Sequence, residues 1–166
     1  EGVEVTAVCS SRSQDDSELS KKHGSSIKSY FDLESMIGSE DLDVISICSY
    51  PAQHKDHVIA CAKAGKHLII EKPLALSIED CAEIRSVVNE HKVKTCVCFE
   101  CRYSSQFLAT KAAIDEGLIG SIHYGEVDYY HGIGPWYGQF RWNTSKENGA
   151  SSLLSAGCHA LDALLL

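Results

Sequence analysis

Hydrophobic and polar positions in the first hundred residues follow two alternating periods. Short apolar runs rich in β-branched residues predict strands, and longer stretches with apolar residues three and four positions apart predict helices. The runs that predict strands span residues 3–9, 27–30, 43–48, 67–71 and 93–99. The helical stretches between them end near His23, Gly38, Gly65 and His91. Strand and helix in alternation are typical of a parallel sheet wound on both faces, so we expect an α/β fold.

The pattern changes after Phe99. It predicts a helix from about Ser105 to Glu116, a longer strand from Ile122 to His131, a loop over residues 132–149 and a final helix over residues 151–166. We therefore place a domain boundary near residues 102–106, with a first domain over residues 1–103 and the beginning of a second over residues 104–166.

Composition narrows the range of partners. The chain has 166 residues with 44% hydrophobic content, which is enough for one domain with a real core. Its net charge of -8 and its 15 scattered basic residues argue against a nucleic-acid surface. No apolar run approaches the roughly 20 residues of a membrane helix. We expect a cytoplasmic protein whose partner is a small molecule, with no nucleic-acid or membrane partner.

The eight cysteines do not predict a disulfide framework. Most stand inside apolar strands or helices, where a reduced thiol behaves as a small hydrophobe. We expect this of Cys9, Cys48, Cys61 and Cys81. Cys98 and Cys101 form a C-x-x-C pair, but no second pair stands at the spacing of a zinc site. The sequence therefore predicts no metal site.

The stretch from His67 to Ala75 is the best candidate for chemistry. An apolar run of strand length is followed by Glu71, Lys72 and Pro73, at the sheet edge where open α/β folds place their active sites. Proline restricts the backbone around Lys72, and the neighbouring carboxylate can tune its charge. We interpret Lys72 as a functional residue. The alternative is a solvated turn in which Pro73 only starts the next helix.

The strand count indicates that a central strand is missing. In the strand order 3-2-1-4-5-6, the first strand lies in the middle of the sheet and leads into a glycine-rich phosphate turn. Residues 10–13, which follow the first predicted strand, contain no glycine. Residues 3–9 are therefore interpreted as the second strand. Two halves of a sheet without their shared neighbour leave unpaired backbone edges.

Several motifs together resemble one family. Residues 64–75, A-G-K-H-L-I-I-E-K-P-L-A, closely resemble the signature A-G-K-H-V-x-x-E-K-P-L-A of the Gfo/Idh/MocA oxidoreductases. Further stretches resemble family motifs in the same order. They are residues 51–54 for P-N-x-x-H, with Ala52 in place of Asn, residues 102–103 for R-F/Y, residues 114–120 for I-x-x-G-x-I-G and residues 149–162 for G-G-G-x-L-x-D-x-G-x-H-x-x-D.

The resemblance implies a fold and an activity. It implies a Rossmann-type, doubly wound parallel sheet over residues 1–103 without its glycine-rich first strand. The start of an α+β substrate and dimerisation domain would follow over residues 104–166. Family members bind NAD or NADP and transfer a hydride between the nicotinamide and a hydroxyl-bearing carbon, usually of a sugar or cyclitol. We expect the complete protein to do so as a homo-oligomer, and the 166 residues alone to be inactive.

The resemblance also implies roles for single residues. Lys72 matches the family's catalytic lysine, joined to Pro73 by a cis peptide bond, and Glu71 matches its neighbour near the nicotinamide ribose. His159 matches the histidine that handles the hydroxyl proton together with lysine. The sequence does not decide whether Lys72 or His159 is the acid/base. The family's aspartate four residues before this histidine is Ser155 here, so its charge is missing.

Residues at the ends of the predicted strands indicate the cofactor. A hydroxyl followed by arginine, Ser11-Arg12, suits the 2'-phosphate of NADP, whereas an acid would suit the 2'-hydroxyl of NAD. We therefore expect NADP, with NAD as the alternative. The further expected cofactor contacts are Ser49, Tyr50, Pro51, His54, Glu71, Lys72 and Pro73. The expected substrate contacts are Arg102, Trp142, Ser155 and His159, with Tyr130 as a further candidate.

Two other functions are compatible with the same sequence. One is a related binding or interaction protein without turnover, which Ser155 and the missing glycine-rich turn favour. The other is a different reaction on the same scaffold, such as glycoside hydrolysis with cofactor recycling. No residue singled out above specifically favours the hydrolase.

Overall fold

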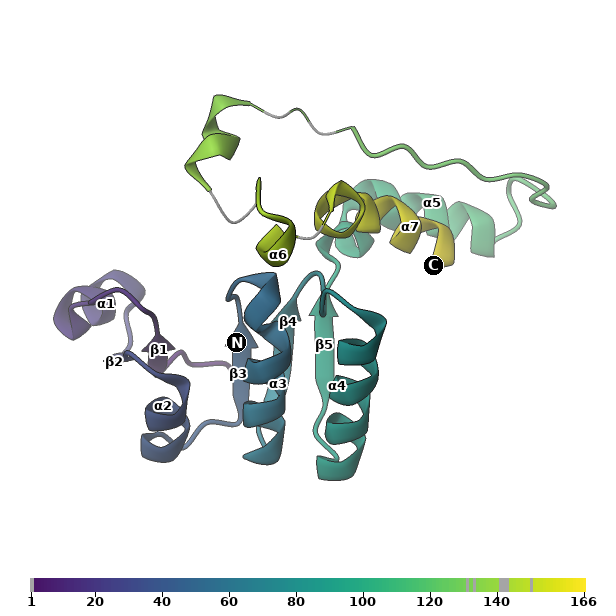
Figure 1. The fold of residues 1–166 in the computed structure, drawn as a ribbon. Coiled ribbons are helices and arrows are strands. Elements are labelled where there is room, and N and C mark those ends of the chain that lie inside the picture. The colour runs from purple at the N-terminus through teal and green to yellow at the C-terminus, as the bar shows by residue number, and fades with distance from the viewer. Residues whose placement is uncertain (1, 131, 133, 141–143, 150) are drawn as a thin grey trace.

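A computed structural model describes the chain except for residues 1, 131, 133, 141–143 and 150 (Figure 1). The described strands are β1 (Ala7–Cys9), β2 (Lys28–Tyr30), β3 (Val44–Ile47), β4 (His67–Glu71) and β5 (Thr95–Cys98). The α-helices are α1 (Asp16–His23), α2 (Leu33–Ser39), α3 (His54–Lys63), α4 (Ile78–His91), α5 (Ser105–Asp115), α6 (Lys146–Gly149) and α7 (Cys158–Leu165). Short 3-10 helices span Pro51–Gln53, Glu100–Tyr103 and Pro135–Gln139, and a π-helix spans Leu153–Gly157.

Local side-chain chemistry sets where the helices begin and end. The Asp15, Asp32 and Ser77 side chains accept hydrogen bonds from backbone N–H groups in the first turns of α1, α2 and α4. Gly65 follows α3 with φ 73°, a left-handed conformation that glycine adopts without steric cost. The predicted helices of the first hundred residues are confirmed, with shifts of a few residues at their ends.

The strands form two separate parallel sheets. β1 pairs with β2, and β3, β4 and β5 form a three-stranded sheet in that order. β1 and β3 have no ladder between them. Parallel pairing brings the carboxyl ends of β3, β4 and β5 to one edge of the sheet, where the chain continues into Ser49, Lys72 and Phe99.

The core lies on one face of the three-stranded sheet. In β3 and β4 every second residue, including Ile47 and Ile70, is buried on the face that α3 and α4 cover (Figure 1). The residues between them, such as Val44 and Ile69, are exposed. We expected helices on both faces, but no described helix covers the second one. The burial therefore alternates along β3 and β4, instead of being continuous as in a sheet covered on both sides.

The segment after α5 differs most from the prediction. The predicted strand covers residues 122–131, of which residue 131 lies outside the described residues. Residues 122–130 run across the molecule without pairing to any described strand, and every one of them is exposed (Figure 1). A strand needs a neighbouring backbone to satisfy its N–H and C=O groups, and none of the described segments supplies one here. The strand prediction is therefore wrong for residues 122–130.

The cysteines are free thiols in a range of environments. Cys61 is fully buried in the core, and burial raises its pKa to about 11. Cys81 is half-buried. Cys9 and Cys48 were expected to pack as small hydrophobes, but both are exposed, because no described helix covers them.

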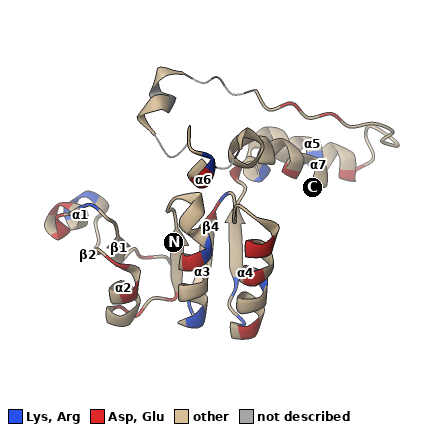
Figure 2. Cartoon of the chain, in the orientation of Figure 1, with Lys and Arg blue, Asp and Glu red and all other residues tan. Residues whose placement is uncertain are grey.

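Charged side chains of both signs are mixed on the same helices. Figure 2 shows acidic and basic residues together on α1 and α3, and α1 begins with acidic residues and ends with basic ones. This order complements the helix dipole. Among the described helices, none has the length and apolar character needed to cross a membrane.

The core can be tested with a matched pair of isoleucines. Ile70→Ala, at a fully buried position of β4, should lower the free energy of unfolding by about 2–5 kcal/mol, because it opens a cavity against α3 and α4. Ile78→Ala, at the exposed start of α4, should change it by less than about 0.5 kcal/mol. Urea unfolding monitored by circular dichroism measures both. Equal effects at the two positions would contradict the described core.

Candidate active site

Lys72 connects the edge of the sheet to the last helical segment of the chain. It directly follows β4, and the Lys72–Pro73 peptide bond is cis, as predicted. Its Nζ donates a hydrogen bond of 2.7 Å to the backbone oxygen of Ser155. Ser155 lies in the π-helix that precedes α7, and π-helical turns occur frequently at functional sites. The structure thus brings Lys72 to the segment that carries His159.

His159 is buried at the start of α7, with only 4% of its surface exposed. Its ring stacks on Tyr129 at 5.6 Å between centroids and meets Phe99 edge-to-face at 6.0 Å. Its Nε2 lies 3.5 Å from a carboxylate oxygen of Glu100. Nδ1 is buried and has no hydrogen-bond partner among the described residues. The ring is therefore held by aromatic contacts, with Nε2 facing the Glu100 carboxylate and Nδ1 without a partner among the described residues.

Arg102 and Asp162 fasten α7 to the segment after β5. Nε of Arg102 donates a 2.7 Å hydrogen bond to Asp162 Oδ2, and its Nη2 donates a second one to Oδ1. Two parallel bonds fix both distance and orientation, and Asp162 is nearly buried. This ion pair holds Phe99 and Glu100 beside His159. The guanidinium therefore has a structural partner, and the expected contact between Arg102 and a sugar stays a prediction.

His54 connects the loops that follow β3 and β4. It is completely buried, and its Nδ1 and Nε2 lie 2.8 Å from Pro73 O and 3.0 Å from Ser49 O. Both partners are carbonyl oxygens, which only accept hydrogen bonds, so the ring makes both bonds only when both nitrogens carry a proton. His54 has no exposed surface, so its role is to connect these two loops inside the protein. The direct cofactor contact that we expected of it is not what this position offers.

The remaining expected cofactor contacts lie along the same edge. Ser49 Oγ is 2.9 Å from Nδ1 of His57, whose pKa is lowered by burial and then by the charge of His54. Tyr50 is half exposed, and Pro51 is buried at the start of its 3-10 helix. The side chain of Glu71 turns back to accept a 3.2 Å hydrogen bond from the Lys72 backbone N–H.

Ser11 and Arg12 are exposed in the turn after β1. The Arg12 backbone N–H donates to the Ser10 hydroxyl at 3.2 Å, which shapes this turn. Its guanidinium forms no ion pair with a carboxylate of the described residues. An unpaired arginine at the carboxyl end of a parallel strand is a suitable partner for a phosphate. This turn therefore fits the 2'-phosphate of NADP.

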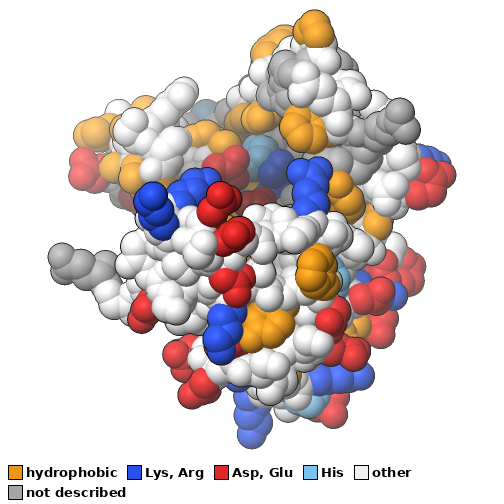
Figure 3. All heavy atoms as spheres, turned by 90° about the vertical axis from the view of Figure 1, so that its left-hand side faces the viewer, with side chains coloured by type: hydrophobic (Ala, Val, Ile, Leu, Met, Phe, Trp, Pro, Cys, Tyr) orange, Lys and Arg blue, Asp and Glu red, His pale blue; other side chains and the backbone are white. Residues whose placement is uncertain are grey.

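Figure 3 shows a hollow between the upper and lower parts of the molecule, in which histidine and basic side chains are visible. The structure assigns neither of two expected substrate contacts, Trp142 and Tyr130, to this hollow. Trp142 falls outside the described residues, and Tyr130 is 92% exposed on the unpaired segment. Sequence reasoning missed Glu100 and Tyr129, which contact His159 only because the chain folds back on itself. No local spacing in the sequence indicated these two contacts.

Two family models cover almost all of the chain. Parallel strands that alternate with helices along the chain are typical of the Rossmann-like α/β fold. Residues 1–99 match the family described as "Oxidoreductase family, NAD-binding Rossmann fold", and residues 107–166 match the "GFO/IDH/MocA C-terminal domain". The chain therefore belongs to the Gfo/Idh/MocA oxidoreductase family, which confirms the resemblance and the fold class inferred from the motifs.

Curated relatives and solved structures agree with this assignment. The chain is 27% identical to scyllo-inositol 2-dehydrogenase (NADP(+)) IolW of Bacillus subtilis, over 81% of this chain and 37% of that protein. It is 28% identical to D-glucoside 3-dehydrogenase of Escherichia coli, over 98% of this chain and 46% of that protein. The chain thus spans less than half of either relative.

A solved structure shows the same fold. The WlbA dehydrogenase from Bordetella pertussis, crystallised with NADH and UDP-GlcNAcA, superimposes with a TM-score of 0.85 at 22% identity. The match covers 97% of this chain and 46% of that one. At this identity the likeness shows the fold alone.

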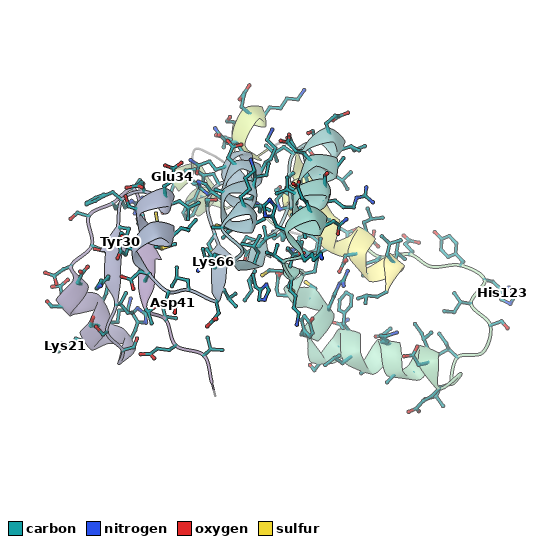
Figure 4. The ribbon with its side chains drawn as sticks, turned by 90° about the horizontal axis from the view of Figure 1, so that it is seen from below. Lys21, Tyr30, Glu34, Asp41, Lys66 and His123 are labelled. Carbon is teal, nitrogen blue, oxygen red and sulfur yellow. The ribbon has the colours of Figure 1, made fainter. Side chains whose placement is uncertain are left out.

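The role of His54 can be tested by removing its ring. His54→Ala should lower the free energy of unfolding by at least about 2 kcal/mol, because it removes a fully buried ring and its contacts to the carbonyl oxygens of Pro73 and Ser49. His123→Ala is the control, since His123 is exposed on the segment 122–130, away from the sheet (Figure 4). It should change stability by less than about 0.5 kcal/mol. Urea unfolding measures both variants. Similar effects would contradict the inferred role of His54 in connecting the two loops.

Proposed function

We propose that the complete protein is an oxidoreductase that transfers a hydride between NADP, or NAD, and a hydroxyl-bearing carbon of a sugar, cyclitol or related polyol. The observation that carries this proposal is the 2.7 Å hydrogen bond from Lys72 to the segment bearing His159. It supports the proposal because it joins Lys72, a group able to move a proton, to the helical segment that carries His159, a second such group. Family membership and the relatives, an inositol and a glucoside dehydrogenase, support it.

Residues of this chain at the sheet edge are proposed to hold the dinucleotide. Arg12 and Ser11 would contact the 2'-phosphate, and Ser49, Tyr50 and Pro51 would lie beside the cofactor along the edge. When bound, the nicotinamide would supply or accept the hydride. Glu71, with its carboxylate next to the Lys72 backbone, would lie near the nicotinamide ribose. The exposed, unpaired guanidinium of Arg12 supports NADP over NAD.

Lys72 and His159 are proposed to handle the proton of the substrate hydroxyl. Oxidation of an alcohol requires one group to accept this proton as the hydride leaves. His159 is buried, and its Nδ1 has no hydrogen-bond partner among the described residues, so this nitrogen is not engaged by another side chain. Lys72 is held in direction by Ser155 O and by the adjacent Pro73. Ser155 would add a hydroxyl contact to the substrate in place of the family's carboxylate.

The alternative of a binding protein without turnover rests on Ser155 alone among the described residues. Its backbone oxygen nevertheless receives Lys72, so the lysine is positioned without the carboxylate. This observation favours the enzyme.

Three broader features complete the proposal. The boundary between the nucleotide-binding domain and the substrate domain lies near residues 102–106, between the ranges that the two family models match. The eight free thiols support a reducing, cytoplasmic location. The exposed apolar side chains of residues 122–130 support a homo-oligomer, because such surface is normally covered by a partner.

Replacement of Lys72 tests the catalytic proposal. In the complete protein, Lys72→Ala should lower kcat for polyol oxidation by at least about 100-fold, because a proton-transfer group is lost. The affinity for NADPH, measured by NADPH fluorescence, should change less than about threefold, because the substitution affects the transition state and not the binding of the cofactor in the ground state. Loss of affinity with unchanged kcat would remove Lys72 from the chemistry.

Lys66 provides the matched control for this experiment. Lys66, labelled in Figure 4, directly precedes β4, whereas Lys72 directly follows it, and the Lys66 amine forms no ion pair with the described residues. Lys66→Ala should leave both kcat and NADPH affinity unchanged. A complete protein that binds neither dinucleotide would instead favour the interaction protein.

Replacement of Arg12 tests the choice of cofactor. Arg12→Ala should weaken NADPH binding by about 10–100-fold. This is the loss of affinity expected when a charge-assisted contact of about 1.5–3 kcal/mol is removed. NADH binding should change less than about threefold, because NADH lacks the 2'-phosphate. Arg85→Ala, on the exposed side of α4, should change neither affinity. Equal losses for both cofactors would show that Arg12 does not select NADP.

A further inference from the structure

Three side chains of metal-ligand type meet next to the proposed proton-transfer site. A carboxylate oxygen of Glu100, the sulfur of Cys101 and a ring nitrogen of His159 all lie within 4.8 Å of one another. Glu100 and Cys101 are adjacent in the 3-10 helix after β5, whereas His159 comes from α7. The spacing of C-x-x-C in the sequence did not indicate this group, because its third member arrives only through the fold.

We propose that Glu100, Cys101 and His159 bind a zinc-type divalent ion. Carboxylate oxygen, thiolate sulfur and imidazole nitrogen are the ligands that zinc takes in proteins. Bond lengths of about 2.0–2.3 Å in a tetrahedral site place ligand atoms about 3.3–3.8 Å apart. The 3.5 Å between His159 Nε2 and Glu100 Oε1 lies in this range, and the exposed side chain of Glu100 can adjust to close the remaining distances.

The charges and the surroundings of the cluster support a divalent cation. A glutamate and a thiolate together supply two negative charges, which balance the charge of the ion, and the thiol releases its proton on binding. Only 4% of the surface of His159 is exposed, its Nδ1 has no hydrogen-bond partner among the described residues, and its Nε2 faces the Glu100 carboxylate at 3.5 Å. The Arg102–Asp162 pair holds the two ligand-bearing segments together. Three protein ligands leave a fourth position for water.

Metal binding has a consequence for the proposed reaction. A ring nitrogen of His159 that is bound to a metal has no lone pair for the substrate proton. The ion should therefore inhibit hydride transfer reversibly, and this consequence rests on the proposed function. The binding site itself does not, because it depends only on the three ligands.

Cobalt and zinc titrations of the complete protein test the site. Co²⁺ should produce a thiolate-to-cobalt absorption band in the near ultraviolet, which Cys101→Ser should abolish. Zn²⁺ affinity, measured by calorimetry, should fall at least about 10-fold in Cys101→Ser and in Glu100→Gln, because loss of even an outer partner of a metal costs about 10–100-fold. Cys98→Ser, the other member of the C-x-x-C pair, is the matched control and should keep both the band and the affinity.

The outcomes separate this proposal from the proposed function. Absence of the cobalt band, a band that survives Cys101→Ser, or equal zinc affinity in all variants would overturn the site. A Cys101-dependent band in a protein that transfers no hydride would support the site and count against the enzyme. In an active protein, Zn²⁺ should inhibit turnover, a chelator should reverse the inhibition, and Cys101→Ser should weaken it at least about 10-fold. Inhibition that is unchanged by Cys101→Ser would contradict the link to His159.

Discussion

One buried imidazole determines the geometry of the sheet edge on which the proposed chemistry depends. The two ring nitrogens of His54 lie within hydrogen-bond distance of Pro73 O and Ser49 O, so this ring connects the loops after β3 and β4. Loss of this ring would leave carbonyl oxygens without a partner, and a buried carbonyl without a donor costs about 1–3 kcal/mol. Lys72 leaves the strand just before Pro73, and its direction follows from this arrangement. The contact of Lys72 with Ser155 O therefore depends on the way His54 connects the two loops.

The last helical segment is positioned by two polar links rather than by a large apolar interface. Lys72 reaches the π-helix from the sheet, and Arg102 reaches α7 from the segment after β5. Most apolar residues of the C-terminal part are exposed, including Leu161, Leu164 and Leu165. Hydrogen bonds and ion pairs are directional, so they can fix the orientation of a helix where packing contributes little. His159 is placed by this orientation together with its contacts to Phe99 and Tyr129.

Sequence reasoning succeeded where structure is set locally and failed where it depends on distant partners. Caps such as Asp32 and Ser77 act within one turn, so the helix starts were predictable. The 122–130 strand was not, because pairing depends on a neighbouring backbone that the local pattern cannot reveal. Lys72 and His159 were found through their motifs. The contact between Glu100 and His159 was not, since residues far apart in the sequence meet only after folding.

Ser155 in place of a carboxylate changes what the lysine can do under the proposed function. An aspartate would pair with the ammonium form of Lys72 and oppose its deprotonation. A backbone carbonyl accepts a hydrogen bond from an ammonium and from a neutral amine alike, because both carry N–H donors. Under the proposed function, a proton transfer at Lys72 would therefore leave its 2.7 Å contact to Ser155 O in place. The position of the amine stays fixed through such a cycle, which a group that exchanges protons with a substrate hydroxyl requires.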